Sequence, residues 1–236
     1  MADTFTVRLA EAQDIRRLAE VEKAAWQNEG TPVFGEEHFR TWLDLFPEGF
    51  FLTEENSIIV AYIYLQLIRF DADQAQLPDY NALTDHGYTR STHDPSGNHI
   101  FGVTICSLSR GAGRMLIDRL IAFSEERRLP ALGVSRIPDF SRYLAESGIT
   151  EPTAEEERSL ALHYGIECAK MVQGKIHPRA YAFHKPGNYP PVKSPDSVLR
   201  TYLKHPDVML FRLLPDFCQD PKSRNFNFLL IYEPRS

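Results

Sequence analysis

The sequence of 236 residues has few cysteines, no long hydrophobic run and no excess of positive charge. Its three cysteines, Cys106, Cys168 and Cys218, are widely spaced and form no CxxC pair. This usage favours reduced thiols in a reducing compartment over a disulfide framework. The formal net charge of −6 argues against a broad nucleic-acid-binding surface, so any anion site must be local.

The distribution of apolar residues predicts neither a membrane span nor a secretion signal. The most apolar run, residues 58–68, is too short to cross a bilayer and is rich in β-branched residues and tyrosine, which predicts a buried strand. Residues 1–17 contain no apolar stretch of the kind found in secretory signals. We therefore expect a cytoplasmic protein with no membrane partner.

The residues that are present predict a mixed α/β fold in a single domain over residues 1–236. At 43% hydrophobic and 25% charged, the chain has enough apolar material for a sizeable core. Hydrophobic periodicity predicts strands over residues 5–10, 50–55, 57–70, 99–106, 131–135, 207–214 and 225–233. It predicts helices near 14–22, over 36–46, after Gly113, from a Thr153–Glu156 capping box to about 174, and over 198–203.

Two long polar regions are expected to shape the fold's periphery. Residues 71–98 show little periodicity, which is typical of a functional loop or a disordered one, and residues 151–236 form an extended C-terminal part. Residues 85–99 also contain histidines and aspartates in spacings that fit no common metal-ligand pattern, so we expect solvated loop residues and no metal. These residues are Asp85, His86, His93, Asp94 and His99.

The stretch SLSRGAGRMLIDRL, residues 107–120, places two glycines and two arginines between a strand and a helix. Glycines at such a point commonly serve a sharp turn and nothing more. Arginine at a helix start is unfavourable, however, unless an anion also sits there, and the backbone N–H groups would suit a pyrophosphate. A Walker loop is excluded because its lysine and hydroxyl residue are missing. The GxGxxG fingerprint of dinucleotide-binding folds is disfavoured, because Leu116 occupies the position of its third glycine. Arg136, at the end of the next predicted strand, is the one feature in its favour, since an arginine there binds a 2′-phosphate in such folds.

Residues 108–113, LSRGAG, resemble the acyl-CoA loop of the GNAT N-acetyltransferase superfamily, [RQ]xxGx[GA] between a strand and a helix, with Leu108 at the charged first position. The segments FTVRLAEAQDIRRLAEVEKAAW and FFLTEENSIIVAYIYLQL resemble the superfamily's opening strand and helix and its second and third strands. The stretches GVSRIPDFSRYL and LLPDFCQDPKSRNFNFLLIYE resemble a branch of GNAT domains sometimes fused to nitrilase-like amidohydrolases. The resemblance implies a GNAT fold, with a mixed central sheet flanked by helices.

The resemblance also implies a co-substrate and a reaction. Acetyl-CoA or another acyl-CoA would donate its acyl group to a small amine, without a metal. Arg136 and Asp139, after the fifth strand, would bind the acceptor, unless Arg136 simply pairs with a neighbouring carboxylate. A homodimer is compatible with this reading. The implied acyl-CoA contacts are Thr104, Ile105, Cys106, Arg110, Gly111, Ala112, Gly113 and Arg114.

The proton-transfer groups are less defined by the resemblance. Many members use a tyrosine four residues before a Gly-aromatic pair, and Phe183 stands at that position here. Tyr181, His184 and Tyr164 are the candidates that remain. Cys106 is expected to be a core thiol, and Ser107 and Ser109 lack a nucleophile elbow.

We therefore expect an acyl-CoA-dependent N-acyltransferase. The alternatives are a catalytically silent acyl-CoA-binding or interaction module of the same fold, favoured by Phe183, and an NADP-dependent oxidoreductase, which the missing third glycine disfavours.

Overall fold

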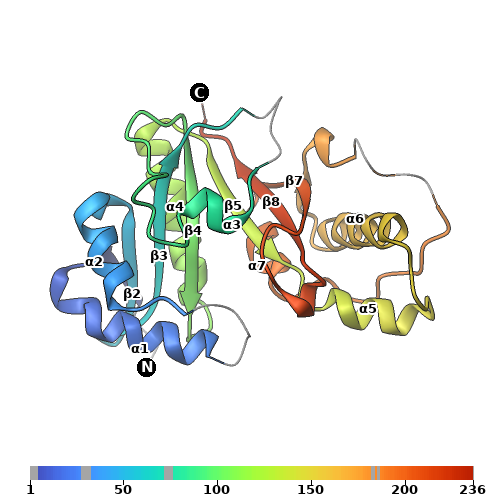
Figure 1. Ribbon diagram of the computed structural model, residues 1–236, viewed down its shortest axis with the longest axis horizontal. Helices are drawn as coiled ribbons and strands as arrows, with labels where there is room; N and C mark the ends of the chain where they lie inside the picture. The colour runs from blue at the N-terminus through green and yellow to red at the C-terminus, as the bar shows by residue number, and fades with distance from the viewer. Residues whose placement is uncertain (1–4, 28–32, 72–76, 182–183, 185–186, 236) are drawn as a thin grey trace. The chain divides into compact units, whose positions relative to one another are not determined.

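The computed structural model describes residues 5–27, 33–71, 77–181, 184 and 187–235 (Figure 1). Contacts between Cα atoms group the chain into two units, Met1–Ala131 with Pro234–Ser236, and Leu132–Glu233. Each unit combines β-strands with helices, so the predicted mixed α/β class is confirmed. The single-domain expectation remains a prediction.

The first unit contains four strands in the order β1-β2-β3-β4, each antiparallel to its neighbour. The strands are β1 (Phe5–Leu9), β2 (Phe50–Glu55), β3 (Ile58–Ile68) and β4 (His99–Ser107). The helices are α1 (Ile15–Trp26), α2 (Glu36–Leu45), α3 (Tyr80–Thr84) and α4 (Ala112–Arg127). The hairpin turn between β2 and β3 uses Asn56 and Ser57, both at positive φ.

Strand alternation places helices on both faces of this sheet. Phe50 and Phe51 are successive residues of β2 and therefore point to opposite faces. Phe50 packs edge-on against Trp42 of α2 at 5.4 Å between ring centroids, and Phe51 packs against Phe123 of α4 at 5.6 Å. The core of the first unit thus has two layers of aromatic side chains, one on each side of the strands.

Residues 77–98 contain a short helix and are held by hydrogen bonds from the core. A short helix, α3, begins after Asp79, whose carboxylate accepts a hydrogen bond from the Ala82 N–H. The Trp42 indole donates to the Gly87 carbonyl at 2.7 Å, and the Tyr64 and Thr89 hydroxyls lie 3.2 Å apart. Of the two readings left open for residues 71–98, a functional loop and a disordered one, the disordered one does not describe residues 77–98, because core side chains of the sheet and α2 hydrogen-bond to them.

The second unit contains strands in the order β5-β8-β7-β6, with β7 antiparallel to β8 and parallel to β6. The strands are β5 (Ala131–Arg136), β6 (Lys175–Ile176), β7 (Val208–Pro215) and β8 (Phe226–Tyr232). The helices are α5 (Phe140–Ser147), α6 (Ala154–Met171) and α7 (Leu199–Leu203). The two-residue strand β6 was not predicted, because a run this short has no periodicity to detect.

Helix α6 is the long helix of this unit, and it begins as predicted. The Thr153 hydroxyl accepts from the Glu156 N–H, and the Glu156 carboxylate accepts from the Thr153 N–H, which completes the capping box. Gly165 lies against the Phe228 ring of β8, where a Cβ atom would come within 2.1 Å of the ring. The missing side chain therefore allows α6 to approach the strands closely.

Candidate functional site

The loop between β4 and α4 forms the turn that the glycine pattern predicted. Gly111 caps α4 in the left-handed conformation at φ +100°, which a residue with a Cβ atom adopts only with strain. A Cβ atom at Gly113 would lie 3.4 Å from Cβ of Ser107, so the helix start passes close to the strand end. The Leu108 N–H donates to the Val60 carbonyl and fixes the loop to β3.

The two arginines of this loop have different surroundings. Arg114 forms an ion pair with Asp118, one turn further along α4, at 2.8 Å. Arg110 is exposed and forms no ion pair with any described residue. Among the described residues, the Arg110 guanidinium therefore has no ion-pair partner at the amino end of the 16-residue helix α4, where the backbone N–H groups also attract anions.

Strand β4 contains a β-bulge directly before the residues implied to contact the acyl-CoA arm. Tyr64 of β3 pairs with Thr104, whereas Leu65 pairs with Gly102, so Val103 is the extra residue. The Tyr80 hydroxyl donates to the Val103 carbonyl at 3.0 Å. Bulges of this kind re-aim the residues that follow them.

Cys106 is the last of these strand residues, and it is a core thiol, as the sequence favoured. The side chain is buried, and burial raises the pKa of the thiol above its ordinary value. A thiol with a raised pKa is a poor nucleophile, since the thiolate is the reactive form. All three cysteines of the chain are free in the structure.

A buried acid that the sequence did not single out lies in the same unit. Glu22 of α1 accepts hydrogen bonds from the Tyr62 hydroxyl at 2.6 Å and from the Phe34 N–H at 3.1 Å. Burial raises the pKa of Glu22 despite these two donors. No motif marks this residue, because its partners lie 12 and 40 positions away along the chain.

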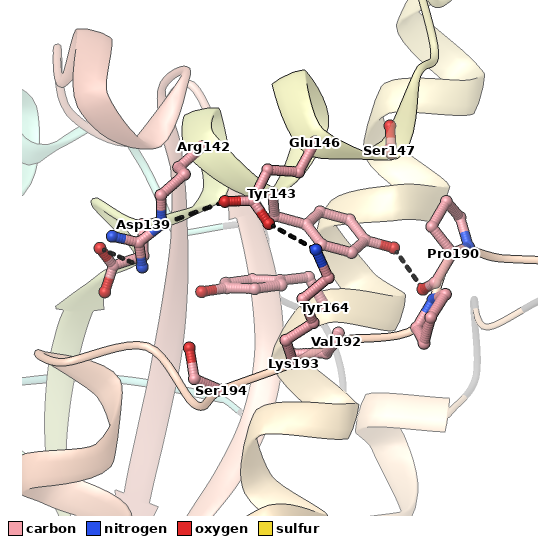
Figure 2. A pocket seen from close by; sticks show the side chains of 11 residues that line it. Asp139, Arg142, Tyr143, Glu146, Ser147, Tyr164, Pro190, Val192, Lys193 and Ser194 are labelled. Atoms are coloured by element: carbon pink, nitrogen blue, oxygen red, sulfur yellow. Dashed lines mark hydrogen bonds and ion pairs between the residues drawn. The ribbon is translucent and has the colours of Figure 1, made fainter.

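The second unit contains a pocket of about 270 Å³, shown in Figure 2. It brings together two of the predicted site residues, Asp139 and Tyr164. Tyr164 is only 2% exposed, and burial raises the pKa of its phenol, which therefore stays protonated at neutral pH. The pocket is also lined by residues that sequence reasoning missed, namely Arg142, Tyr143, Glu146, Ser147, Pro190, Pro191, Val192, Lys193 and Ser194.

Arg136 does not line this pocket. Its guanidinium donates to the Asp220 carboxylate through Nε at 2.6 Å and through Nη2 at 2.9 Å. Burial alone would raise the pKa of Asp220, but hydrogen bonds from Arg136 and Ser223 outweigh it and lower the pKa. Of the two readings that the sequence left open for Arg136, the structure shows the pairing with a neighbouring carboxylate. The substrate role stays a prediction.

Two further candidates lie near the end of the 3-10 turn Pro178–Tyr181. Tyr181 is exposed, and the His184 N–H donates to its carbonyl at 3.0 Å. The Nε2 atom of His184 is buried and has no hydrogen-bond partner among the described residues. His163 and Tyr189 lie beside it, with ring centroids 6.1 and 6.0 Å from that of His184. Phe183, the position of the tyrosine used by many superfamily members, lies outside the described residues.

The described ranges contain neither a candidate metal site nor a candidate membrane span. These residues contain no group of three or more His, Cys, Asp or Glu side chains that could hold a metal ion. His93 accepts a hydrogen bond from the Leu67 N–H, and His99 contacts Asn98. None of the helices in the described part of the chain is long and apolar enough to span a membrane.

Comparison with known sequences gives one distant relative. No family model matches the chain. Over 147 residues, 60% of this chain, the sequence is 26% identical to the probable hydrolase YhcX of Bacillus subtilis. The matched stretch spans 28% of that protein's length. The predicted link to the amidohydrolase-fused branch therefore stays a prediction.

Comparison with solved structures matches nearly the whole chain. The GphF GNAT-like decarboxylase in complex with isobutyryl-CoA aligns over 98% of this chain and 100% of that one, with a TM-score of 0.68 and 18% identity. The loading GNATL domain of CurA from Lyngbya majuscula aligns over 98% of both chains, with a TM-score of 0.62 and 16% identity. The chain therefore has the GNAT fold that its glycine loop and its opening segments predicted.

Proposed function

We propose that this protein binds an acyl-CoA at the loop of residues 107–114 and transfers the acyl group to a small amine. The observation that carries the proposal is the position of Arg110 at the amino end of α4, beside Gly111 with its left-handed backbone conformation. Arg110 is exposed and has no ion-pair partner among the described residues. Arginine and backbone N–H groups together are a common phosphate-binding arrangement. The isobutyryl-CoA complex of the structurally similar GphF protein supports the same ligand class.

The residues of the loop fit a pyrophosphate in two respects. Neither Gly111 nor Gly113 carries a Cβ atom, so backbone N–H groups at the helix start can be approached closely. Arg110 is exposed, so it can reach an anion without breaking an existing ion pair. Arg114 would contribute only by sharing its charge with Asp118.

The proposed reaction is direct attack of an amine on the thioester. The nitrogen forms a bond to the carbonyl carbon as the carbon–sulfur bond breaks, the nitrogen loses a proton to a base, and the CoA thiolate takes up a proton. Among the candidate proton-transfer groups, His184 has a buried Nε2 that lacks a partner among the described residues, and it stays our candidate base. Tyr164 is a hydrogen-bond donor in this proposal, since its raised pKa makes it a weak acid.

Ligand binding and turnover test the proposal in two steps. Titration calorimetry and thermal shift with CoA, acetyl-CoA and NADP come first, and we expect stabilisation by CoA and acetyl-CoA. Stabilisation by NADP alone would favour the oxidoreductase alternative instead. Thiol release from acetyl-CoA over a broad amine panel comes second. CoA binding without any release would favour the silent acyl-CoA-binding module.

A second candidate activity is decarboxylation of a carboxyacyl-CoA. The observation that favours it is the full-length match to GphF, which is named a GNAT-like decarboxylase. In such a reaction the carbon–carbon bond to the carboxylate breaks, CO₂ leaves, and a proton takes its place on the α-carbon. The thioester survives, so conversion of malonyl-CoA to acetyl-CoA without thiol release distinguishes this activity from acyl transfer.

A further inference from the structure

The pocket of the second unit is formed by three segments that are distant in sequence. Helix α5 contributes Asp139, at its N-cap, together with Arg142, Tyr143 and Glu146, and helix α6 contributes Tyr164. The segment 190–194 closes the remaining side (Figure 2). At about 270 Å³ the pocket suits a small molecule.

The charged side chains of this pocket differ in how much of each is exposed to solvent. Asp139 is the most enclosed of them, with 23% of its side chain exposed. Arg142 and Lys193 are 60% and 75% exposed, so they lie at the rim. Both rim cations already pair with carboxylates, Arg142 with Asp139 at 3.1 Å and Lys193 with Glu146 at 3.1 Å. Water screens exposed cations strongly, whereas an enclosed carboxylate acts at closer to full strength.

A second carboxylate lies behind Asp139. Asp196 is completely buried and accepts hydrogen bonds from the N–H groups of Asp139, Val198 and Leu199. After burial, the main cause, the charges of Asp196 and Asp139 both contribute to the raised pKa of Tyr164. Both carboxylates therefore add negative potential near Tyr164, and burial, which raises the pKa of Asp196, lessens the share of Asp196.

Aromatic faces line the pocket beside these acids. The Tyr143 and Tyr164 ring centroids are 5.0 Å apart, at an interplanar angle of 35°. The Tyr143 hydroxyl already donates to the Pro190 carbonyl at 2.9 Å, so this side chain offers its ring to a ligand. In Figure 2 the Tyr164 hydroxyl points toward the side of the pocket that holds Asp139. Aromatic faces attract cations through their quadrupole.

We infer that this pocket binds a small organic ammonium ion, with the ammonium at Asp139 and the carbon stem over the tyrosine rings. That this ion is the amine acceptor rests on the function proposed above. The binding itself depends only on the second unit. An anionic ligand at Arg142 and Lys193 is the competing occupant. Either ligand meets existing contacts, since the Asp139 carboxylate pairs with Arg142 and accepts from the Ser197 N–H, and exposure is what favours the cation: Arg142 and Lys193 are far more exposed than Asp139.

The test is titration of the whole protein, without CoA, with n-butylammonium, n-butanol and butyrate, followed by calorimetry and by protein NMR. These probes share one stem and differ in charge. We expect saturable binding of butylammonium, at least about tenfold tighter than either other probe. Equal binding of all three, or a preference for butyrate, would overturn the inference.

Substitutions place the binding at Asp139. Asp139→Asn should weaken butylammonium binding about tenfold or more, whereas Glu151→Gln, which removes the same charge from an exposed residue outside the pocket, should leave it unchanged. If Asp139→Asn lowers the melting temperature too far for titration, Lys193→Ala gives the answer, because Lys193 is mostly exposed. Removing this rim cation should preserve or slightly strengthen butylammonium binding, and a loss of binding would contradict the inference.

The same protein sample separates this inference from the proposed function. Binding of butylammonium without binding of CoA would retain the pocket and reject the acyltransferase. Binding of CoA with thiol release in the amine panel, but without binding of butylammonium, would retain the acyltransferase and reject the pocket.

Discussion

The Tyr62 hydroxyl donates a 2.6 Å hydrogen bond to the Glu22 carboxylate, and both side chains are buried in the first unit. Burial is the main cause that raises the pKa of Glu22 above its ordinary value of 4.5. The acid therefore contributes stability that is complete below about pH 4.5 and is lost as the pH rises through the folded-state pKa.

Glu22→Gln should remove this pH dependence. The free energy of unfolding of the natural protein, minus that of the variant, should fall as the pH rises above 4.5, by at most about 1.4 kcal/mol per pH unit. Urea unfolding at a series of pH values measures the difference. A difference that is constant with pH, or that grows, would show that Glu22 is ionised in the fold without penalty.

Arg136→Ala should destabilise the protein by about 3 kcal/mol, because it leaves the buried Asp220 carboxylate without its cation. Arg200→Ala, which truncates an exposed arginine of the same unit, should cost less than about 0.5 kcal/mol. Chemical denaturation of the two variants tests this. Unchanged stability together with lost amine binding would favour the substrate role for Arg136.

Arg110→Ala should weaken CoA binding about tenfold or more, since this cation has no competing ion pair among the described residues. Arg114→Ala should have a smaller effect, because Asp118 already offsets its charge. Arg16→Ala is the control, because Arg16 is 89% exposed on α1, outside the loop, and forms only a long ion pair with Glu20 at 3.8 Å. Calorimetry that finds equal affinity in all three variants would reject the phosphate role of the loop.

Gly165→Ala should destabilise the protein by about 1–3 kcal/mol, because its Cβ atom would overlap the fully buried Phe228 ring. Gly133→Ala has open space around the new atom and should be tolerated. Thermal unfolding of the two variants gives the comparison. Equal melting temperatures would mean that α6 shifts away from β8 at little cost.

Local signals predicted much of the fold. The Thr153–Glu156 capping box and the apolar, β-branched and tyrosine-rich run of residues 58–68 act over a few positions, and the structure confirms both. For residues 71–98 the sequence left a functional loop and a disordered one open, because the order of residues 77–98 comes from distant partners. Gly87 accepts from Trp42, which lies 45 positions earlier, and Thr89 contacts Tyr64, 25 positions earlier.

The two parts of the candidate site also differ in whether the sequence predicts them. The glycine loop could be predicted, because strand, turn and helix are contiguous there. The pocket could not, because Asp139, Tyr164 and Lys193 belong to segments that only the tertiary structure brings together. Arg142 and Glu146 did carry a weak signal, the i,i+4 spacing of an ion pair on a helix. Lys193 carried none.

The β-bulge at Val103 divides β4 into two regular segments, residues 99–102 and 104–107. Side chains alternate along a regular strand, so one inserted position reverses the facing of everything after it. Because Val103 is that inserted position, Gly102 and Thr104 stand opposite Leu65 and Tyr64, which are successive residues of β3 and point to opposite faces of the sheet. A single-residue deletion at Val103 would therefore remove the bulge and leave Thr104, Ile105 and Cys106 on the faces that they already occupy, whereas a deletion within residues 104–106 would not restore a regular strand without shifting side chains to the other face.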